Sequence, residues 1–215
     1  FPYTTLFRSS VATAGVACVL TAKATLDAVR AHGLRPTLFR TLIATLIVFC
    51  SFEVLWHHPV GVSEVHLILG STLFLLFGLA PTAIGLSLGL LIQGVFFAPT
   101  DLPQLGMNVT TLLVPLFALA ALAPRIVKPS TAYIDLSYRQ TLKLSLIFQG
   151  GVVAWVAFWT LYGQGVNTTT LSGLATFASA YSVVILFEPL LDLGILAAVK
   201  GSRLQESLAL ERNAT

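Results

Sequence analysis

Charged residues are scarce in this chain of 215 residues. Only 10% are Asp, Glu, Lys or Arg, whereas about 25% is usual for a water-soluble domain. Hydrophobic residues make up 56%, and the mean hydropathy is +0.87. This composition excludes a soluble globular domain and predicts a polytopic protein embedded in a lipid bilayer. The net charge of +3 comes from a few Lys and Arg that act as topology signals, so we expect no nucleic-acid partner.

Cysteines and enzymatic motifs are equally sparse. Cys18 and Cys50 both lie inside apolar runs, which favours small packing residues over a disulfide or a metal pair. No glycine-rich loop ending in Gly-Lys-Ser or Gly-Lys-Thr is present, so the chain does not hydrolyse ATP by itself. The motif His-Glu-x-x-His is missing too, and Glu64-Val65-His66 alone is weak evidence for a metalloprotease. We predict a protein that is not an enzyme; a membrane-embedded metal-dependent hydrolase and a substrate-free assembly subunit are the alternatives.

The chain also lacks an initial methionine. Its first nine residues, Phe-Pro-Tyr-Thr-Thr-Leu-Phe-Arg-Ser, resemble the in-frame translation of a sequencing adapter, and they lack the apolar core of a secretory signal. We expect residues 1–9 to replace the native amino end. The predicted organisation is therefore an adapter-derived segment at 1–9, one integral-membrane helical bundle at 10–200, and a polar cytoplasmic tail at 201–215.

Apolar runs occupy most of the remaining chain. Their lengths suit helices that cross a hydrocarbon core of about 30 Å. The seven runs are 10–31, 38–56, 63–78, 81–97, 106–123, 139–162 and 171–199. We predict an all-α bundle of about seven transmembrane helices, with the reversal between the third and fourth made by residues 78–81.

Basic residues mark alternate connections between these runs. They are Arg30, Arg35 and Arg40; Arg125, Lys128, Arg139 and Lys143; and Lys200, Arg203 and Arg212. The connections at 57–62, 98–105 and 163–170 contain no Lys or Arg. Because positively charged loops stay in the cytoplasm, we predict an external amino terminus, a cytoplasmic carboxyl terminus and a multi-pass location in a bacterial plasma membrane.

Three of the four histidines lie in one short polar stretch, residues 57–67. Imidazoles and carboxylates on an outer surface without basic residues attract and bind divalent cations. His66 lies three residues into a predicted helix with apolar neighbours, where a buried imidazole needs a partner. We predict that His66 is a metal ligand, with a satisfied structural histidine as the alternative.

The other polar residues on this surface are weaker candidates. His57 and His58 adjoin Trp56, which marks the membrane boundary, so an interfacial role is the favoured interpretation over a metal ligand. Asp101 is interpreted as a turn residue and Glu53 as a helix-end anchor.

Three charges lie well inside the apolar runs. Glu188 and Asp192 are four residues apart and share one helix face. Lys23 and Asp192 are each roughly 12 Å from the inner ends of their helices. We predict an ion pair between Lys23 and Asp192; a proton or ion relay, aided by a kink at Pro189, is the alternative.

Small residues form stripes on two helices. Ala14, Cys18 and Ala22 recur every four residues on the first, which permits close helix approach. Docking of a partner subunit and packing within the bundle both remain open for this stripe. For Gly85 and Gly89 on the fourth helix, we predict internal packing.

An ordered series of segments resembles a known family. Residues 60–70 (Val-Gly-Val-Ser-Glu-Val-His-Leu-Ile-Leu-Gly), 85–93 leading to Phe96-Phe97, and 105–108 (Leu-Gly-Met-Asn) are similar to the CbiM/NikM family. Its members are the substrate-specific membrane components of energy-coupling-factor ABC transporters for cobalt and nickel. The resemblance spans residues 10–199 and implies a seven-helix protein that captures Co2+ or Ni2+ as substrate. It also implies ATPase subunits and a coupling transmembrane subunit as partners, and no organic cofactor.

The resemblance further implies a ligand set. In the family, a Met-His amino end supplies amine, backbone and imidazole nitrogens, and His66 matches the histidine that joins them. Such a nitrogen-rich set suits Co2+ and Ni2+ alike. Asn108 is carried over as a partner that orients a ligand, and Glu64 is predicted to play the same part. With residues 1–9 in place of the Met-His end, we expect this chain to bind metal poorly.

Overall fold

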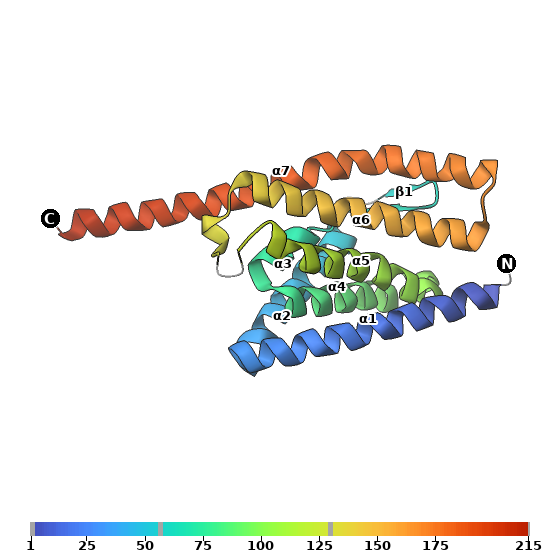
Figure 1. Ribbon diagram of the computed structural model, residues 1–215, viewed down its shortest axis with the longest axis horizontal. Helices are drawn as coiled ribbons and strands as arrows, with labels where there is room; N and C mark the ends of the chain where they lie inside the picture. Colours follow the sequence, from blue (N-terminus) through green and yellow to red (C-terminus); the bar gives the residue numbers. More distant parts are fainter. Residues whose placement is uncertain (1–2, 56–57, 129–130, 215) are drawn as a thin grey trace.

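A computed structural model describes residues 3–55, 58–128 and 131–214. Helices dominate it, with one short β-hairpin (Figure 1). The elements in chain order are α1 (Tyr3–His32), α2 (Leu34–Phe49), the π-helical turn η1 (Cys50–Val54), β1 (His58–Val60), β2 (Ser63–Val65), α3 (Gly70–Phe77), α4 (Leu79–Phe96), η2 (Pro99–Gln104), α5 (Leu105–Leu122), η3 (Ala123–Arg125), η4 (Tyr133–Asp135), α6 (Tyr138–Gln164) and α7 (Thr168–Ala214). The predicted all-helical membrane class is confirmed.

Within those ranges, six helices are long and apolar enough to cross a membrane. They are α1, α2 with η1, α4, α5 with its flanking turns, α6 and α7. The predicted third helix at 63–78 differs, since only the eight residues of α3 are helical. The third passage instead consists of β2, the irregular residues 66–69 and α3. Such irregular backbone is tolerated at membrane depth where protein surrounds it.

The chain still passes along the bundle seven times. The hairpin and the α6–α7 connection lie at the end where the chain begins (Figure 1). The α1–α2 and α5–α6 connections, which carry the basic residues, lie at the end from which α7 protrudes. The termini are therefore at opposite ends, as an odd number of passages requires.

Glycines set two features of the helical packing. Gly78, with φ of 86°, ends α3 and precedes α4, so the predicted reversal is confirmed. A Cβ on Gly85 would lie 2.7 Å from the Cβ of Ala44 in α2, and one on Gly89 would lie 2.5 Å from Val48 Cγ1. The predicted internal packing of the α4 glycines is therefore confirmed.

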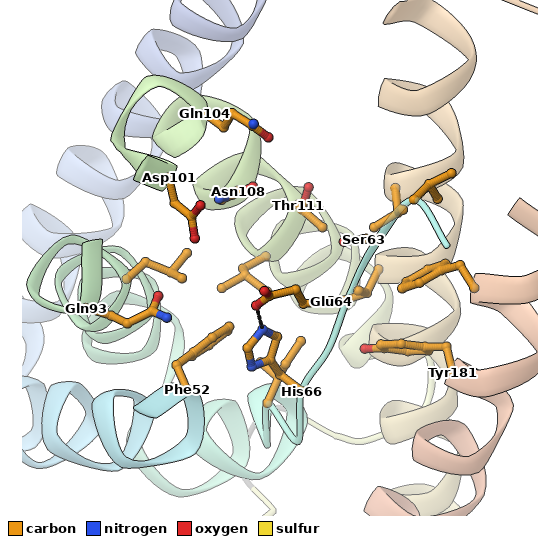
Figure 2. A pocket seen from close by; sticks show the side chains of 17 residues that line it. Phe52, Ser63, Glu64, His66, Gln93, Asp101, Gln104, Asn108, Thr111 and Tyr181 are labelled. Atoms are coloured by element: carbon orange, nitrogen blue, oxygen red, sulfur yellow. Dashed lines mark hydrogen bonds and ion pairs between the residues drawn. The ribbon is translucent and has the colours of Figure 1, made fainter. Parts of the chain in front are cut away.

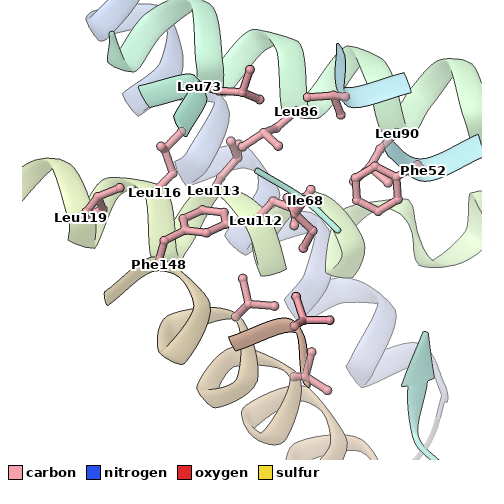
Figure 3. Close-up of a cluster of buried hydrophobic side chains, with 14 of the residues drawn as sticks. Phe52, Ile68, Leu73, Leu86, Leu90, Leu112, Leu113, Leu116, Leu119 and Phe148 are labelled. Carbon is pink, nitrogen blue, oxygen red and sulfur yellow. The ribbon is translucent and has the colours of Figure 1, made fainter. Parts of the chain in front are cut away.

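Aliphatic side chains from α3, α4 and α5 fill the centre of the bundle (Figure 3). Leu86 and Leu116 are fully buried there, as is Phe148 of α6 in the same cluster. Close approach is needed at this point, because a Cβ on Gly70 would lie 2.1 Å from the Phe148 ring. The start of α3 is thus held directly against α6.

The outer helices present apolar side chains outward. On α1, Val16 is 63% exposed and Val19 69% exposed, as expected for a surface in contact with lipid. Cys18 and Ala22 are exposed too, so bundle packing does not cover most of the predicted small-residue stripe.

The two terminal helices are longer than predicted. α1 begins at Tyr3, and α7 continues to Ala214 as a helix of 47 residues with Pro189 inside it. The residues predicted as a polar tail therefore continue the last helix.

Candidate metal-binding site

A close contact between two glycines places the hairpin against α7. The strands pair in antiparallel register, with Pro59 opposite Glu64. At the turn, Gly61 has φ of 62°, and a Cβ there would lie 2.4 Å from the backbone oxygen of Gly173. A Cβ on Gly173 would in turn lie 2.8 Å from Val62 Cγ1. Only backbone fits at this contact, which orients β2 along the bundle.

Beside β2 lies a cavity of about 190 Å³, far more than one water molecule needs. Its polar lining comes from β2 and the adjoining residue 66, α4, η2, α5 and α7 (Figure 2). The polar residues are Ser63, Glu64, His66, Gln93, Asp101, Gln104, Asn108, Thr111 and Tyr181. No Lys or Arg lines this cavity in the part of the chain described. Two carboxylates without a basic neighbour make the cavity attractive to cations.

His66 projects into this cavity with only 8% of its surface exposed. Its Nε2 lies 3.0 Å from Glu64 Oε2, and its ring packs on Phe52 with 4.5 Å between centroids. An extended chain puts residues two apart on the same side, whereas a helix would turn them away from each other. The extended geometry that replaced the predicted helix therefore creates this pair. A carboxylate on one ring nitrogen fixes the tautomer and orients the other nitrogen.

Asn108 and Asp101 line the same cavity from different elements. Asn108 lies in the first turn of α5 and was predicted to orient a ligand; the structure brings it to the cavity that holds His66 and Glu64. Asp101, interpreted from sequence as a turn residue, lies in η2 and also faces this space. The two acidic residues that line the cavity, Glu64 and Asp101, thus come from different elements.

Two other candidates lie elsewhere. His58 is exposed at the start of β1 and is absent from the cavity lining. His57 lies outside the described residues. Glu53 belongs to η1 and does not line the cavity.

Sequence reasoning missed five polar residues of the cavity. Two of them, Ser63 and Thr111, lie in β2 and α5, and the other three are Gln93, Gln104 and Tyr181. Gln93 is a single amide within an apolar run, and that isolation was the signal available. The others are ordinary for a loop, a strand or a membrane helix, so only the fold reveals them.

Protein side chains do not form a complete metal cage here. In the described ranges, no group of three or more His, Cys, Asp or Glu is arranged to hold a metal ion. His66 with Glu64 is the pair that the structure provides. A bound metal therefore needs further donors from outside this set.

The predicted ion pair between Lys23 and Asp192 is wrong. Lys23 is exposed on α1, whereas Asp192 is 1% exposed and accepts a hydrogen bond from Ser71 Oγ at 2.7 Å. α1 and α7 lie on opposite sides of the bundle (Figure 1). Equal depth along the membrane did not make α1 and α7 neighbours.

Burial and the nearby charge of Asp192 raise the pKa of Tyr133, in η4, to about 12.

Tyr181 connects the cavity wall to a buried amide on α6. Its hydroxyl donates to Gln149 Oε1 at 2.7 Å, and both side chains are at most 1% exposed. Replacing Tyr181 with phenylalanine is expected to lower the free energy of unfolding by about 1–3 kcal/mol, because a buried acceptor loses its donor. Denaturant unfolding in detergent measures this. Tyr138→Phe is the control, since Tyr138 is 50% exposed and its loss is expected to cost no more than about 0.5 kcal/mol; equal effects would contradict the prediction.

Comparison with known proteins covers nearly the whole chain. A family model described as the cobalt uptake substrate-specific transmembrane region, CbiM, matches residues 7–206. The match includes the hairpin, the cavity and the helices that surround it. No curated protein and no solved structure matches.

Proposed function

This chain belongs to the cobalt uptake substrate-specific transmembrane family, and on that premise we propose that its cavity captures Co2+ through His66. Membership makes it a multi-pass membrane component of cobalt uptake and not itself an enzyme. The observation that carries the proposal is the position of His66, a buried imidazole oriented by Glu64 in a cavity that no described Lys or Arg lines. Ni2+ is included as a substrate, because imidazole and amine nitrogens suit both metals.

The remaining donors in this proposal come from a Met-His amino end. Ser10 lies against the first turn of α5, since a Cβ on Gly106 would be 3.1 Å from the Ser10 backbone oxygen. Gly106 is two residues before Asn108, which lines the cavity. Ser10 therefore lies near the side of the cavity that Asn108 lines. This position supports a site whose remaining donors come from the residues that precede Ser10.

Energy for uptake is proposed to come from partner subunits. The sequence has no phosphate-binding loop of its own, so ATP hydrolysis is assigned to a pair of ATPase subunits joined by a coupling transmembrane subunit, as in energy-coupling-factor transporters. The stripe at Ala14, Cys18 and Ala22, of which the last two are exposed, is proposed as the docking face for the coupling subunit, because small residues allow close helix contact. The proposed location is the bacterial inner membrane.

A changed amino end tests this assignment directly. Replacing residues 1–9 with Met-His is expected to tighten Co2+ binding at least about tenfold, because nitrogen donors are added to the His66 site. Isothermal titration of the purified protein in detergent with Co2+ measures the change. A Met-Ala end of equal length is the control and is expected to leave the affinity of the present chain unaltered. Equal affinities for the Met-His and Met-Ala forms would contradict the proposal.

A further inference from the structure

The third passage leaves backbone groups without helical partners at residues 66–69. Inside a membrane protein, each unsatisfied amide costs several kcal/mol. Two of these amides find one partner far along the chain. Glu188, which is 0% exposed on α7, accepts hydrogen bonds through Oε1 from the backbone N–H groups of Ile68 and Leu69, the latter at 3.0 Å. A single carboxylate oxygen thus satisfies two amides of the irregular segment.

The same segment contains the only strained non-glycine backbone in the described ranges. Leu69 has φ of 56° and precedes the first residue of α3; a left-handed conformation costs about 1–2 kcal/mol for such a residue. Carboxylates of α7 hold the chain on both sides of it. Glu188 binds at Ile68 and Leu69, and Asp192, one turn later on α7, accepts from Ser71 Oγ. The bend at Leu69 is therefore fixed by α7.

His66 lies between two attachments to the same helix. The hairpin turn contacts α7 through Gly61 and Gly173, five residues before His66. The second attachment, at Glu188, begins two residues after it. Ile68 itself lines the cavity together with His66. The stretch that carries Glu64 and His66 is thus held at each end by α7.

We propose that Glu188 is a positioning residue for His66. Its carboxylate holds the amides of Ile68 and Leu69 and thereby fixes the direction in which the imidazole enters the cavity beside Glu64. This inference rests on the proposed function, in which His66 binds the metal. Glu188 makes no contact with the metal in this scheme and acts through the backbone.

Glu188→Ala, Glu188→Gln and Leu190→Ala test the proposal. Alanine removes the acceptor, whereas glutamine keeps an oxygen of the same reach and serves as the conservative rescue. Leu190 is 61% exposed on the same helix, so its truncation controls for a change in α7 that does not touch residues 66–69. Circular dichroism and thermal unfolding establish that each variant is folded; if Glu188→Ala does not fold, Glu188→Asp, which shortens the reach by one methylene, takes its place.

The first measurement needs no metal. Amide hydrogen exchange at residues 68 and 69 is expected to quicken at least about tenfold in Glu188→Ala, because the amides lose their acceptor. Modification of His66 by diethyl pyrocarbonate is expected to quicken with it. Glu188→Gln and Leu190→Ala are expected to stay within about threefold of the parent in both rates. Unchanged His66 reactivity in Glu188→Ala would overturn the proposal.

The second measurement uses Co2+ alone as the probe, on the protein with the Met-His amino end. Glu188→Ala is expected to weaken Co2+ binding about 10–100-fold, as loss of a group that orients a ligand does, and to shift the Co2+ ligand-field absorption bands. Glu188→Gln restores both. If exchange quickens while Co2+ affinity and spectrum stay at the parent values, Glu188 is only structural and the proposal is wrong. If the parent itself binds no Co2+, the proposed function fails, and positioning is then decided by His66 reactivity.

Discussion

Replacing His66 with alanine is expected to weaken Co2+ binding at least about 100-fold and to abolish cobalt accumulation. Among the described residues, His66 supplies the one imidazole in the cavity. The carboxylates of Glu64 and Asp101 that remain are oxygen donors, which match late transition metals less well than nitrogen. The change also exceeds the roughly 10–100-fold loss usual for partners that only orient a ligand. Co2+ titration of the protein with the Met-His amino end measures affinity. Uptake by cells that carry the proposed ATPase and coupling subunits measures transport.

His58 provides the matched control for that experiment. It is a second imidazole on the same hairpin, but it is exposed and does not line the cavity. His58→Ala is expected to keep Co2+ affinity within about threefold of the parent, because surface substitutions away from a site have small effects. If His66→Ala retained the parental affinity, or if His58→Ala lost as much, the metal would bind elsewhere.

The sequence was sufficient to predict the apolar passages and the gathering of the basic connections at one end of the bundle. Both depend on local quantities, namely the length of an apolar run and the Lys and Arg beside it. The third passage was mispredicted as a helix because a short apolar run has the same sequence pattern whether it forms a buried helix or a buried extended segment. What decides between them is Glu188, whose partner Ile68 lies 120 residues earlier. No local pattern contains that contact.

The site was predictable only in part, for a similar reason. Glu64, His66 and Asn108 belong to segments that resemble a family, so their sequence context was informative. Gln104 and Tyr181 reach the cavity because η2 and α7 fold beside β2. The wrong pairing of Lys23 with Asp192 shows the same limit, since depth along a helix carries no information about which helices are neighbours.

A substitution at the hairpin turn is expected to have the largest effect on stability. Gly61→Ala is expected to lower the free energy of unfolding by about 3 kcal/mol or more, because the added Cβ causes both backbone strain and a steric clash. The φ of 62° disfavours any side chain, at a cost of about 1–2 kcal/mol. The added Cβ would also lie 2.4 Å from Gly173 O and 3.2 Å from Phe177 N, and these are backbone atoms of a helix, which do not rotate away as a side chain would.

Gly165→Ala separates the two penalties. Gly165 has φ of 73°, and a Cβ there meets nothing within 4 Å, so this variant is expected to lose only about 1–2 kcal/mol from backbone strain. Denaturant unfolding of both variants in the same detergent gives the difference, which isolates the clash with α7. Because the displaced hairpin carries Glu64 and leads directly into His66, Gly61→Ala is also expected to weaken Co2+ binding in the protein with the Met-His end, whereas Gly165→Ala is not. Should the two alanine variants unfold at the same denaturant concentration, the close contact between Gly61 and Gly173 would not be what holds the hairpin on α7.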